Sequence, residues 1–324
     1  MHYFEHPVAR RRQLLHWLAL GAAAPLLGAC SPPDSLLRVG SIVFPGYEFM
    51  FLARDMGLLD ERRVRMVELL ANTDTLRALA AGQIEAAALT LDEMMAARRD
   101  GVDLRAVLVY DISAGADAVL AHAPVTLKTL QDKRIGVEDS AIGATMLGAV
   151  LQAAGLALDQ VQKVTVTLDR TEEVFRRGAV DVVVSAEPWV SRLEKSGAQR
   201  LFDSSAMATR IVHVLAVRAQ ALETHAAALR YLIAGHFAAQ ALLRRDAPKA
   251  AAAMAARLQS AAVDVPPLFR GLQLPDALQN RQMMRPGALL DRTGQALQKA
   301  WVQTASPQTP ADLRRWADSR FLSA

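Results

Sequence analysis

Residues 72–95, NTDTLRALAAGQIEAAALTLDEMM, contain the pattern that decides the fold. The first part, up to Gly82, is typical of an amphipathic helix. Either Asn72 or Thr73 has the side chain expected of its N-cap, and Gly82 is the residue type that ends a helix. We therefore expect a complete short helix at the start of this stretch.

A strand and a second helix follow without a gap. The apolar run at 85–89 indicates a short buried strand. Thr90 and Glu93 then form a capping-box pattern, which predicts a helix over 90–101. Helix, strand and helix in this order predict a sheet with helices packed on its faces.

The same alternation continues on both sides of this window. Strands are expected at 36–44, 64–70 and 104–112, and a further amphipathic helix at 47–60. Because strands and helices alternate, we expect a parallel sheet. A second set follows from Ala118. Its expected strands lie within 128–138, at 161–168, 181–186 and 210–218, and its helices at 140–156, 171–180 and 187–198.

After Ala219 the chain is alanine-rich and is expected to be helical to its end. The organisation predicts an α/β protein with two lobes, each a sheet flanked by helices, and a helical C-terminal region. We expect the chain to cross between the lobes near Ala118–His122 and near Arg210–Val214. The expected boundaries are 1–29 for a signal peptide, 30–36 for a tether, 37–118 and 212–324 for the first lobe, and 119–211 for the second.

The N-terminus has the pattern of an export signal. Basic residues precede an apolar run, and Leu27-Gly28-Ala29-Cys30 resembles a bacterial lipobox. This resemblance implies cleavage before Cys30, the only cysteine of the chain, and lipidation of its sulfur. An inert cysteine after an ordinary signal peptide is the alternative. Arg11-Arg12 also resembles part of a twin-arginine signal, so either that route or the general secretory route is possible.

Composition narrows the possible partners. The chain has 324 residues and a net charge of +4, of which +2 remains once the three arginines and one glutamate of the first 29 residues are set aside. Aromatic residues make up only 5%, and no basic stripe is interleaved with them, so we do not expect nucleic-acid binding. The histidines form no metal-binding spacing, and no phosphate-binding or nucleophile motif occurs. We therefore expect no metal, no cofactor and no catalytic residue.

Six segments carry a resemblance to a known family. They are Gly46–Leu59, Asn72–Met95, Val109–Ala121, Lys133–Leu147, Gly178–Trp189 and Leu201–Ser205. Their order and spacing resemble the nitrate/sulfonate/taurine-type periplasmic solute-binding proteins of ABC importers, a group related to binders of thiamine-pyrimidine precursors. The resemblance implies a type II twin-lobe fold, a small-molecule ligand, an ABC permease and ATPase as partners, and a periplasmic, membrane-anchored monomer. Related synthases carry a cysteine-rich patch that this chain lacks, so we do not expect an enzyme.

In a twin-lobe α/β fold the ligand is expected at turns where strands lead into helices, because helix N-termini expose unpaired N–H groups. The expected ligand-binding residues are Phe44, Gly46, Tyr47, Glu48, Asn72, Thr73, Asp74, Thr90, Asp92, Ser113, Gly115, Asp117, Ser140, Gly143, Thr145, Glu187 and Trp189. Ordinary structural roles remain open for many of them. Phe44, Tyr47 and Trp189 could be core residues, the polar ones helix caps, Asp117 a hinge residue, and Gly143 a packing residue.

Acidic residues dominate these turns. The acids at or near loop ends are Glu48, Asp74, Asp92, Asp111, Asp117, Glu138, Asp139 and Glu187, whereas Arg210 is the nearest obvious cation. This balance favours a cationic, amine-bearing or planar nitrogenous ligand over a sulfonate or nitrate, although helix N-termini bind anions without basic side chains. Two other functions stay open: a pyrimidine-related enzyme on the same fold, and a lipoprotein that senses or scaffolds.

Overall fold

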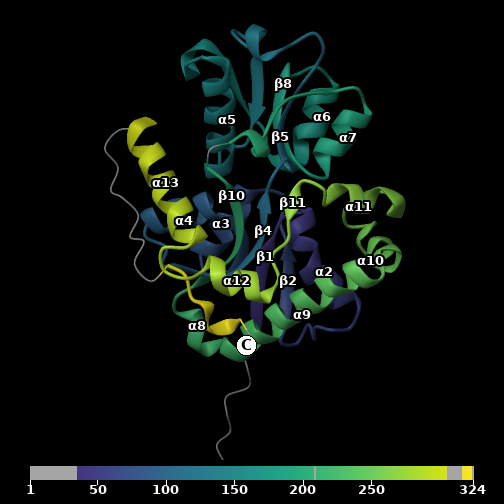
Figure 1. Cartoon of the computed structure of the whole chain (residues 1–324), viewed down its shortest axis with the longest axis vertical. Coiled ribbons are helices and arrows are strands. Elements are labelled where there is room, and N and C mark those ends of the chain that lie inside the picture. The colour runs from purple at the N-terminus through teal and green to yellow at the C-terminus, as the bar shows by residue number, and fades with distance from the viewer. Residues whose placement is uncertain (1–34, 208, 305–315, 323–324) are drawn as a thin grey trace, which may run out of the picture. The chain divides into compact units, whose positions relative to one another are not determined.

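The computed structural model describes residues 35–207, 209–304 and 316–322, without the side chains of 300–304. The described residues from Leu36 onward form one compact unit, which holds two mixed sheets flanked by helices (Figure 1). The expected two-lobe α/β fold class, with its helical C-terminal region, is confirmed. The expected signal peptide and Cys30 lie outside the described residues.

The first lobe is built on a six-stranded sheet of order β11-β4-β10-β3-β1-β2. Helices follow three of its strands, as the alternating sequence predicts. The strands are β1 (Leu37–Ser41), β2 (Val64–Glu68), β3 (Ala86–Thr90), β4 (Leu104–Ser113), β10 (Ile211–Arg218) and β11 (Leu272–Gln273), and the helices are α2 (Glu48–Asp55), α3 (Asn72–Ala80) and α4 (Leu91–Arg99).

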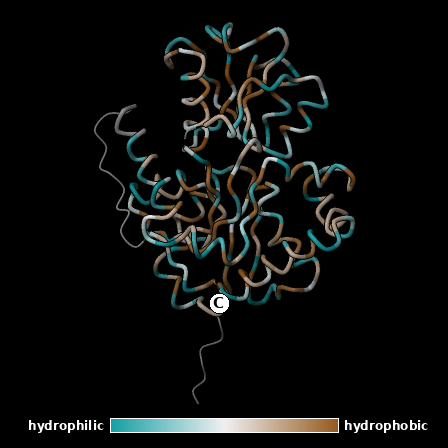
Figure 2. The backbone as a smooth tube through the Cα atoms, viewed as in Figure 1, coloured by the Kyte–Doolittle hydropathy of each residue, from teal (hydrophilic) through white to brown (hydrophobic). Residues whose placement is uncertain are grey.

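The second lobe is built on a five-stranded sheet of order β7-β6-β8-β5-β9. Its helices cover both faces, and each face has its own apolar cluster. The elements are β5 (Asp117–Ala121), β6 (Arg134–Val137), β7 (Gln162–Thr165), β8 (Val182–Ala186), β9 (Gln199–Asp203), α5 (Ala141–Ala154), α6 (Thr171–Arg176) and α7 (Trp189–Lys195). Figure 2 shows hydrophobic backbone positions concentrated along the central strands of both sheets.

The expectation of a purely parallel sheet is wrong. Strands β2, β1 and β3 are parallel, but β10 runs antiparallel to both β3 and β4. In the second sheet β7, β6 and β8 are parallel, and β5 is antiparallel to β8 and β9. The reversed strands are those by which the chain enters a sheet from the other lobe. They arrive without a crossover helix, and it is the helix of a βαβ unit that makes neighbouring strands parallel.

The chain passes between the lobes through two short segments. One is 114–116, between β4 and β5, and the other lies between β9 and β10, where the structure describes 204–207 and 209–210. The first passage lies earlier than the crossing expected near Ala118–His122, which falls inside β5. A hydrogen bond of 2.7 Å joins Ser113 Oγ to Ser204 Oγ, and Gly115 N–H donates to the same Ser204 oxygen. The two connections are therefore bonded to each other.

The local helix signals are partly confirmed. Thr90 accepts from Glu93 N–H, while Glu93 accepts from Thr90 N–H, so the expected capping box is present. The expectation that Asn72 or Thr73 caps α3 is wrong, since Ala71 occupies the N-cap position and has no side-chain acceptor. The acceptor for the start of α3 comes instead from the second lobe, as described below.

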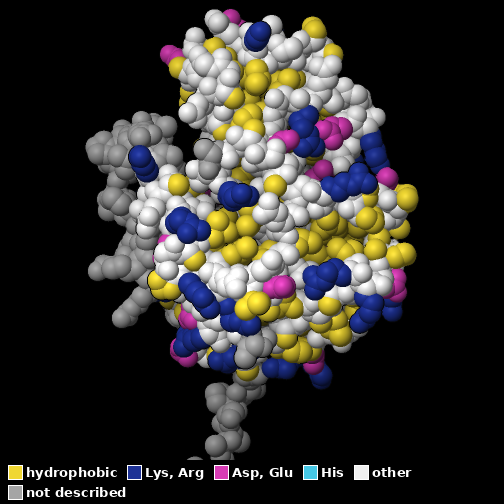
Figure 3. All heavy atoms as spheres, in the orientation of Figure 1, with side chains coloured by type: hydrophobic (Ala, Val, Ile, Leu, Met, Phe, Trp, Pro, Cys, Tyr) yellow, Lys and Arg dark blue, Asp and Glu magenta, His cyan; other side chains and the backbone are white. Residues whose placement is uncertain are grey.

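The helical C-terminal region packs largely on the first lobe. It contains α8 (Ala221–Thr224), α9 (Ala226–Arg245), α10 (Ala247–Met254), α11 (Val265–Leu268), α12 (Ala277–Met283) and α13 (Leu289–Thr304). Among the described residues α9 is the helix long and apolar enough to cross a membrane, but half of that window is buried and it packs beside α2, as a core helix does. Figure 3 shows hydrophobic side chains on the surface over α10 and α11.

Short 3-10 helices complete the described chain. They are η1 (Pro45–Tyr47), η2 (Leu127–Thr129), η3 (Leu158–Gln160), η4 (Leu168–Arg170), η5 (Ser204–Ala206), η6 (Ala262–Asp264) and η7 (Ser319–Phe321).

The outer edge of β4 is completed by the C-terminal region. Only two residues of β11 pair with it. Further along, the side chain of Asn280 on α12 accepts from Val109 N–H at 2.7 Å and donates to Val109 C=O at 3.0 Å. Asn280 is fully buried. It thus replaces a neighbouring strand at this position, because buried backbone groups need partners.

We predict that Asn280→Ala lowers the free energy of unfolding by about 2–4 kcal/mol, because two buried backbone groups lose their partners. Asn280→Asp keeps the shape and the acceptor but loses the donor to the Val109 carbonyl, so it should also destabilise. Urea unfolding measures both changes. Gln282→Ala, at an exposed position of the same helix, is the control, and an Asn280→Ala protein as stable as this control would contradict the role assigned to the amide.

Candidate functional site

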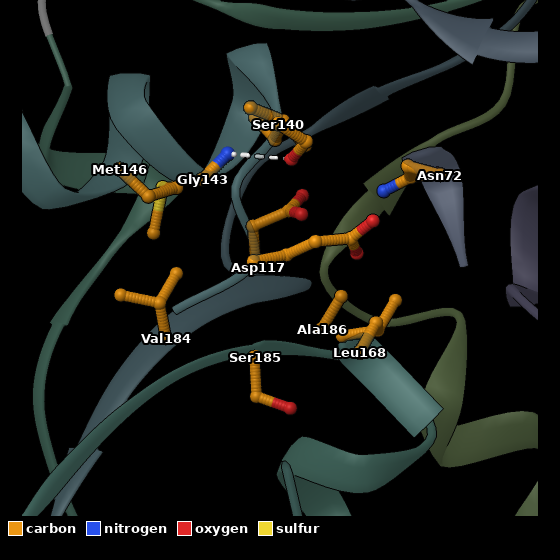
Figure 4. Close-up of a pocket in the computed structure, with 11 residues that line it drawn as sticks. Asn72, Asp117, Ser140, Gly143, Met146, Leu168, Val184, Ser185 and Ala186 are labelled. Carbon is orange, nitrogen blue, oxygen red and sulfur yellow. Dashed lines mark hydrogen bonds between the residues drawn. The ribbon is translucent and has the colours of Figure 1, made fainter. Parts of the chain in front are cut away.

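A cavity lies where the two lobes meet. The cavity is small: its volume is about 40 Å³, which is room for a few water molecules, and it is partly open to solvent. The second lobe supplies most of its lining, and Asn72 at the start of α3 comes from the first lobe. The described lining residues are Asn72, Asp117, Glu138, Ser140, Ile142, Gly143, Met146, Leu168, Val184, Ser185 and Ala186. Figure 4 shows Asp117 in the middle of this set, with Met146 and Val184 on one side and Asn72 on the other.

Two carboxylates give the cavity its charge. Asp117 and Glu138 are 5% and 7% exposed. Asp117 Oδ2 and Glu138 Oε2 have no hydrogen-bond partner among the described residues. No Lys, Arg or His is among the described residues that line the cavity. Buried carboxylate oxygens without donors are unfavourable, so this cavity is suited to a molecule that brings hydrogen-bond donors.

Hydrogen bonds between the lobes lie beside the cavity. Glu138 Oε1, in the second lobe, accepts from Thr73 N–H at 2.9 Å, in the first turn of α3. Thr145 Oγ1 on α5 donates to Asp92 Oδ2 on α4 at 2.6 Å. Asp92 also accepts from Thr90. The start of α3 and the start of α4 are therefore each bonded to the second lobe.

A buried ion pair lies where β4 and β10 leave the first sheet. His213 Nδ1 and Asp111 Oδ1 are 2.7 Å apart, and both side chains are buried. Phe44 and Tyr47 pack on the imidazole, with ring centroids 4.5 and 5.5 Å away. Gly46 fits against the same carboxylate, since a Cβ at this position would lie 1.8 Å from Asp111 Oδ2.

The pKa values of these groups are strongly shifted. Burial alone would lower the pKa of His213, but the Asp111 carboxylate outweighs burial and raises it to about 9. Burial, together with the Asp92 charge, raises the pKa of Glu93 to about 8. Burial also raises the pKa of Asp117 and of Glu138, and the Thr73 N–H opposes the shift at Glu138. At neutral pH His213 is therefore positively charged and Glu93 is largely protonated.

The structure brings some of the expected site residues together. Asn72, Asp117, Ser140 and Gly143 line the cavity. Thr73, Thr90, Asp92 and Thr145 form the hydrogen bonds beside it. Gly143 also has the packing role considered for it, because a Cβ there would lie 2.1 Å from the Glu138 carbonyl oxygen.

Other expected site residues lie away from the lining. Phe44, Gly46 and Tyr47 are buried around His213, and Ser113 and Gly115 join the two lobe connections. Glu48 forms an ion pair with Arg257, and Asp74 forms one with Arg77 at the surface. Glu187 accepts from Ser191 in α7. Trp189 packs into the core of the first lobe, which is the alternative considered for it.

Sequence reasoning missed several lining residues. Glu138 was among the acids at loop ends but not among the expected ligand-binding residues. Ser185 had a visible signal, as a lone hydroxyl within the Val-rich strand β8. The apolar lining residues gave no signal in the sequence. An Ile or Val at a buried position of a strand or helix fits the same periodicity whether its side chain faces a core or a cavity.

Comparisons with known proteins agree with this architecture. A model of the NMT1-like family matches residues 31–259, more than two thirds of the sequence. The chain therefore belongs to the NMT1-like family. No curated protein matches the sequence.

Solved structures share the fold at low identity. SsuA from Xanthomonas axonopodis pv. citri, an alkanesulfonate-binding protein bound to MOPS, is 19% identical with a TM-score of 0.72, over 88% of this chain and 99% of SsuA. The aliphatic sulphonate-binding SsuA from Escherichia coli is 20% identical with a TM-score of 0.70, over 88% and 97%. The desulfurization enzyme DSZB is 18% identical with a TM-score of 0.63, over 88% and 97%. Family and fold confirm the resemblance to nitrate/sulfonate/taurine-type solute-binding proteins.

Glu93 gives a test of the buried charge. Its pKa of about 8 lies above the value of 4.5 for a free glutamate, so the folded state holds this proton more tightly than the unfolded state. The stability that it contributes is full below pH 4.5 and falls as the pH rises to 8. Glu93→Gln keeps an acceptor for Thr90 N–H and removes the loss of stability that ionisation of Glu93 causes as the pH rises. The difference in unfolding free energy between pH 5 and pH 8 should shrink by about 2–4 kcal/mol.

The exposed Glu61→Gln is the matched control for this measurement. The stabilising contribution of His213 also falls as the pH rises towards 9, and Glu93 is one of the groups that raise the His213 pKa. The change in the pH profile of Glu93→Gln therefore reports Glu93 together with its effect on His213. Equal pH profiles for Glu93→Gln and the wild type would show that Glu93 is not a buried acid in solution.

Proposed function

We propose that the protein is a solute-binding lipoprotein that captures a small molecule between its two lobes and delivers it to an ABC permease. One observation carries this proposal: a cavity where the lobes meet, lined from both and containing buried carboxylate oxygens without hydrogen-bond donors. Membership of the NMT1-like family and the fold shared with SsuA support it.

Lobe closure is the mechanism. Two of the interlobe hydrogen bonds, at Thr73 and at Thr145, lie beside the cavity and exist only while the lobes are together. A ligand that contacts Asn72 on one side and Asp117 on the other adds to these bonds, so it favours the closed state over the open one. The closed state then presents a surface to the permease that the open state lacks.

The expected export and anchoring complete the proposal. The family model begins to match at residue 31, directly after Cys30, which supports a boundary between a leader and the binding domain at this position. We place the mature protein in the periplasm, held at the membrane through lipid on Cys30, as a monomer that works with a permease and its ATPase.

Ligand binding is tested by thermal shift with a broad library of cationic, neutral and anionic solutes. A ligand that binds only the folded protein raises its stability by about 2.7 kcal/mol at 100 times its dissociation constant. We expect a saturable rise in melting temperature with at least one solute. In the same assay Thr145→Val, which loses the bond to Asp92, should bind that solute several-fold more weakly and show a larger radius of gyration in small-angle scattering. A melting temperature unchanged across the whole library would overturn the proposal.

Anchoring is tested at Cys30. The wild type expressed in a bacterial host should partition into the detergent phase of Triton X-114, because an acylated cysteine adds about 0.8 kcal/mol of membrane affinity per buried CH₂ group. Cys30→Ser should move the protein to the aqueous phase without changing its melting temperature. Detergent partitioning that survives this substitution would contradict lipidation at this site.

An enzyme is the second candidate, because DSZB shows that the same fold supports catalysis. The described residues around the cavity offer acids and hydroxyl groups but no cysteine, which leaves the binding role better supported. Turnover of any library hit by the purified protein would favour the enzyme.

A further inference from the structure

The three helix starts beside the cavity, those of α3, α4 and α5, each have an acceptor from the chain itself. At α5 the Ser140 hydroxyl accepts from Gly143 N–H at 3.2 Å. At α3, where Ala71 offers no side-chain acceptor, the Glu138 carboxylate accepts from Thr73 N–H across the lobe boundary. An anionic ligand would need such N–H groups, since helix N-termini are where proteins bind anions without basic side chains. Glu138 therefore occupies the position that an anion would take at α3.

The remaining lining also disfavours an anion. Asp117 Oδ2 and Glu138 Oε2, on side chains more than nine-tenths buried, have no donor among the described residues. Around them lies an apolar wall formed by Ile142, Met146, Leu168, Val184 and Ala186. A bound anion would add like charge to two buried carboxylates in a region of low dielectric constant, which is strongly unfavourable.

We propose that this cavity selects a small ligand with an apolar body and a protonated nitrogen head, such as an amidinium or ammonium group, held between Asp117 and Glu138. Glu138 is the residue that determines specificity, because it both receives the cation and keeps anions from the start of α3. This inference rests on the proposed solute-binding function and assigns its ligand class. It sets the chain apart from SsuA, whose named ligands are sulfonates.

The protonation of the two acids supports this assignment. Burial raises the pKa of both Asp117 and Glu138. The charged groups that act on them are His213, Asp111 and Asp92 at Asp117, and Asp169 and Glu93 at Glu138. A cation favours the ionised form of both acids, so it should release protons on binding. Its affinity should also be higher at pH 8 than at pH 5.

Three planar molecules of nearly the same shape test the charge preference: benzamidine, which is a cation, benzamide, which is neutral, and benzoate, which is an anion. Isothermal calorimetry at pH 7.5 measures each against the mature protein. We expect benzamidine to bind, benzamide to bind at least tenfold more weakly, and benzoate not to bind. Calorimetry at pH 5, in two buffers of different ionisation enthalpy, should show proton release with benzamidine, because burial raises the pKa of both acids.

The variants Asp117→Asn and Glu138→Gln assign the preference to these residues. Each keeps its shape, and Glu138→Gln keeps an acceptor for Thr73 N–H. Both should weaken benzamidine binding at least tenfold. Asp139→Asn is the matched control, because Asp139 follows Glu138 in the chain but is exposed and paired with Lys163. It should bind benzamidine as the wild type does. Proton release by the wild type gives a second readout if one variant does not fold.

Each outcome decides the inference. Benzamidine binding that is lost in both acid variants and kept in Asp139→Asn supports it. Tighter binding of benzoate than of benzamidine, failure of benzamidine to bind, or acid variants that behave like Asp139→Asn would overturn it. The broader solute-binding proposal would survive such a result if any neutral or anionic solute of the thermal-shift library stabilises the protein.

Discussion

The ion pair between His213 and Asp111 is the interaction on which the arrangement of the two lobes depends. It joins β10 to β4 where both strands leave the first sheet, with its two atoms 2.7 Å apart in a fully buried site. The same imidazolium also offsets the charge of Asp117. Removing it would leave these acids uncompensated in the interior, a change that typically costs several kcal/mol. Because His213 is committed to Asp111, the free oxygens of Asp117 and Glu138 stay available to the cavity.

Much of the fold was predictable because its signals are local. Alternating strands and helices, the capping box at Thr90 and the N-cap at Ser140 depend on residues a few positions apart. The direction of β5 and β10 is not local, since it is set by where the other lobe lies. The absence of a side-chain cap at Ala71 was unpredictable for the same reason, because the acceptor is Glu138, 65 positions from its donor Thr73.

The candidate site was predictable only where turns and chemistry coincide. Asn72, Ser140 and Gly143 stand at strand–helix turns, and Asp117 begins β5 where the chain enters the second lobe. These four expected positions line the cavity. Tyr47 also stands at such a turn, but its ring is fully buried against His213. A turn places a side chain near the lobe boundary, but the packing of neighbouring elements decides whether it faces the cavity or the core.

Ligand charge and lobe closure depend on the same side chain. Glu138 belongs to the second lobe, yet one of its oxygens bonds α3 of the first, while the other faces the cavity beside Asp117. When the lobes separate, Thr73 N–H returns to water and Glu138 loses this partner. Asp117 and Glu138 both belong to the second lobe and stay together, so opening removes only the first lobe's contribution to the cavity, which is Asn72 and the start of α3. A cation held by the two acids gains its contact with the first lobe only in the closed form, whereas an anion would compete with Glu138 for the start of α3. Glu138 therefore couples the charge of the bound ligand to the closure of the two lobes.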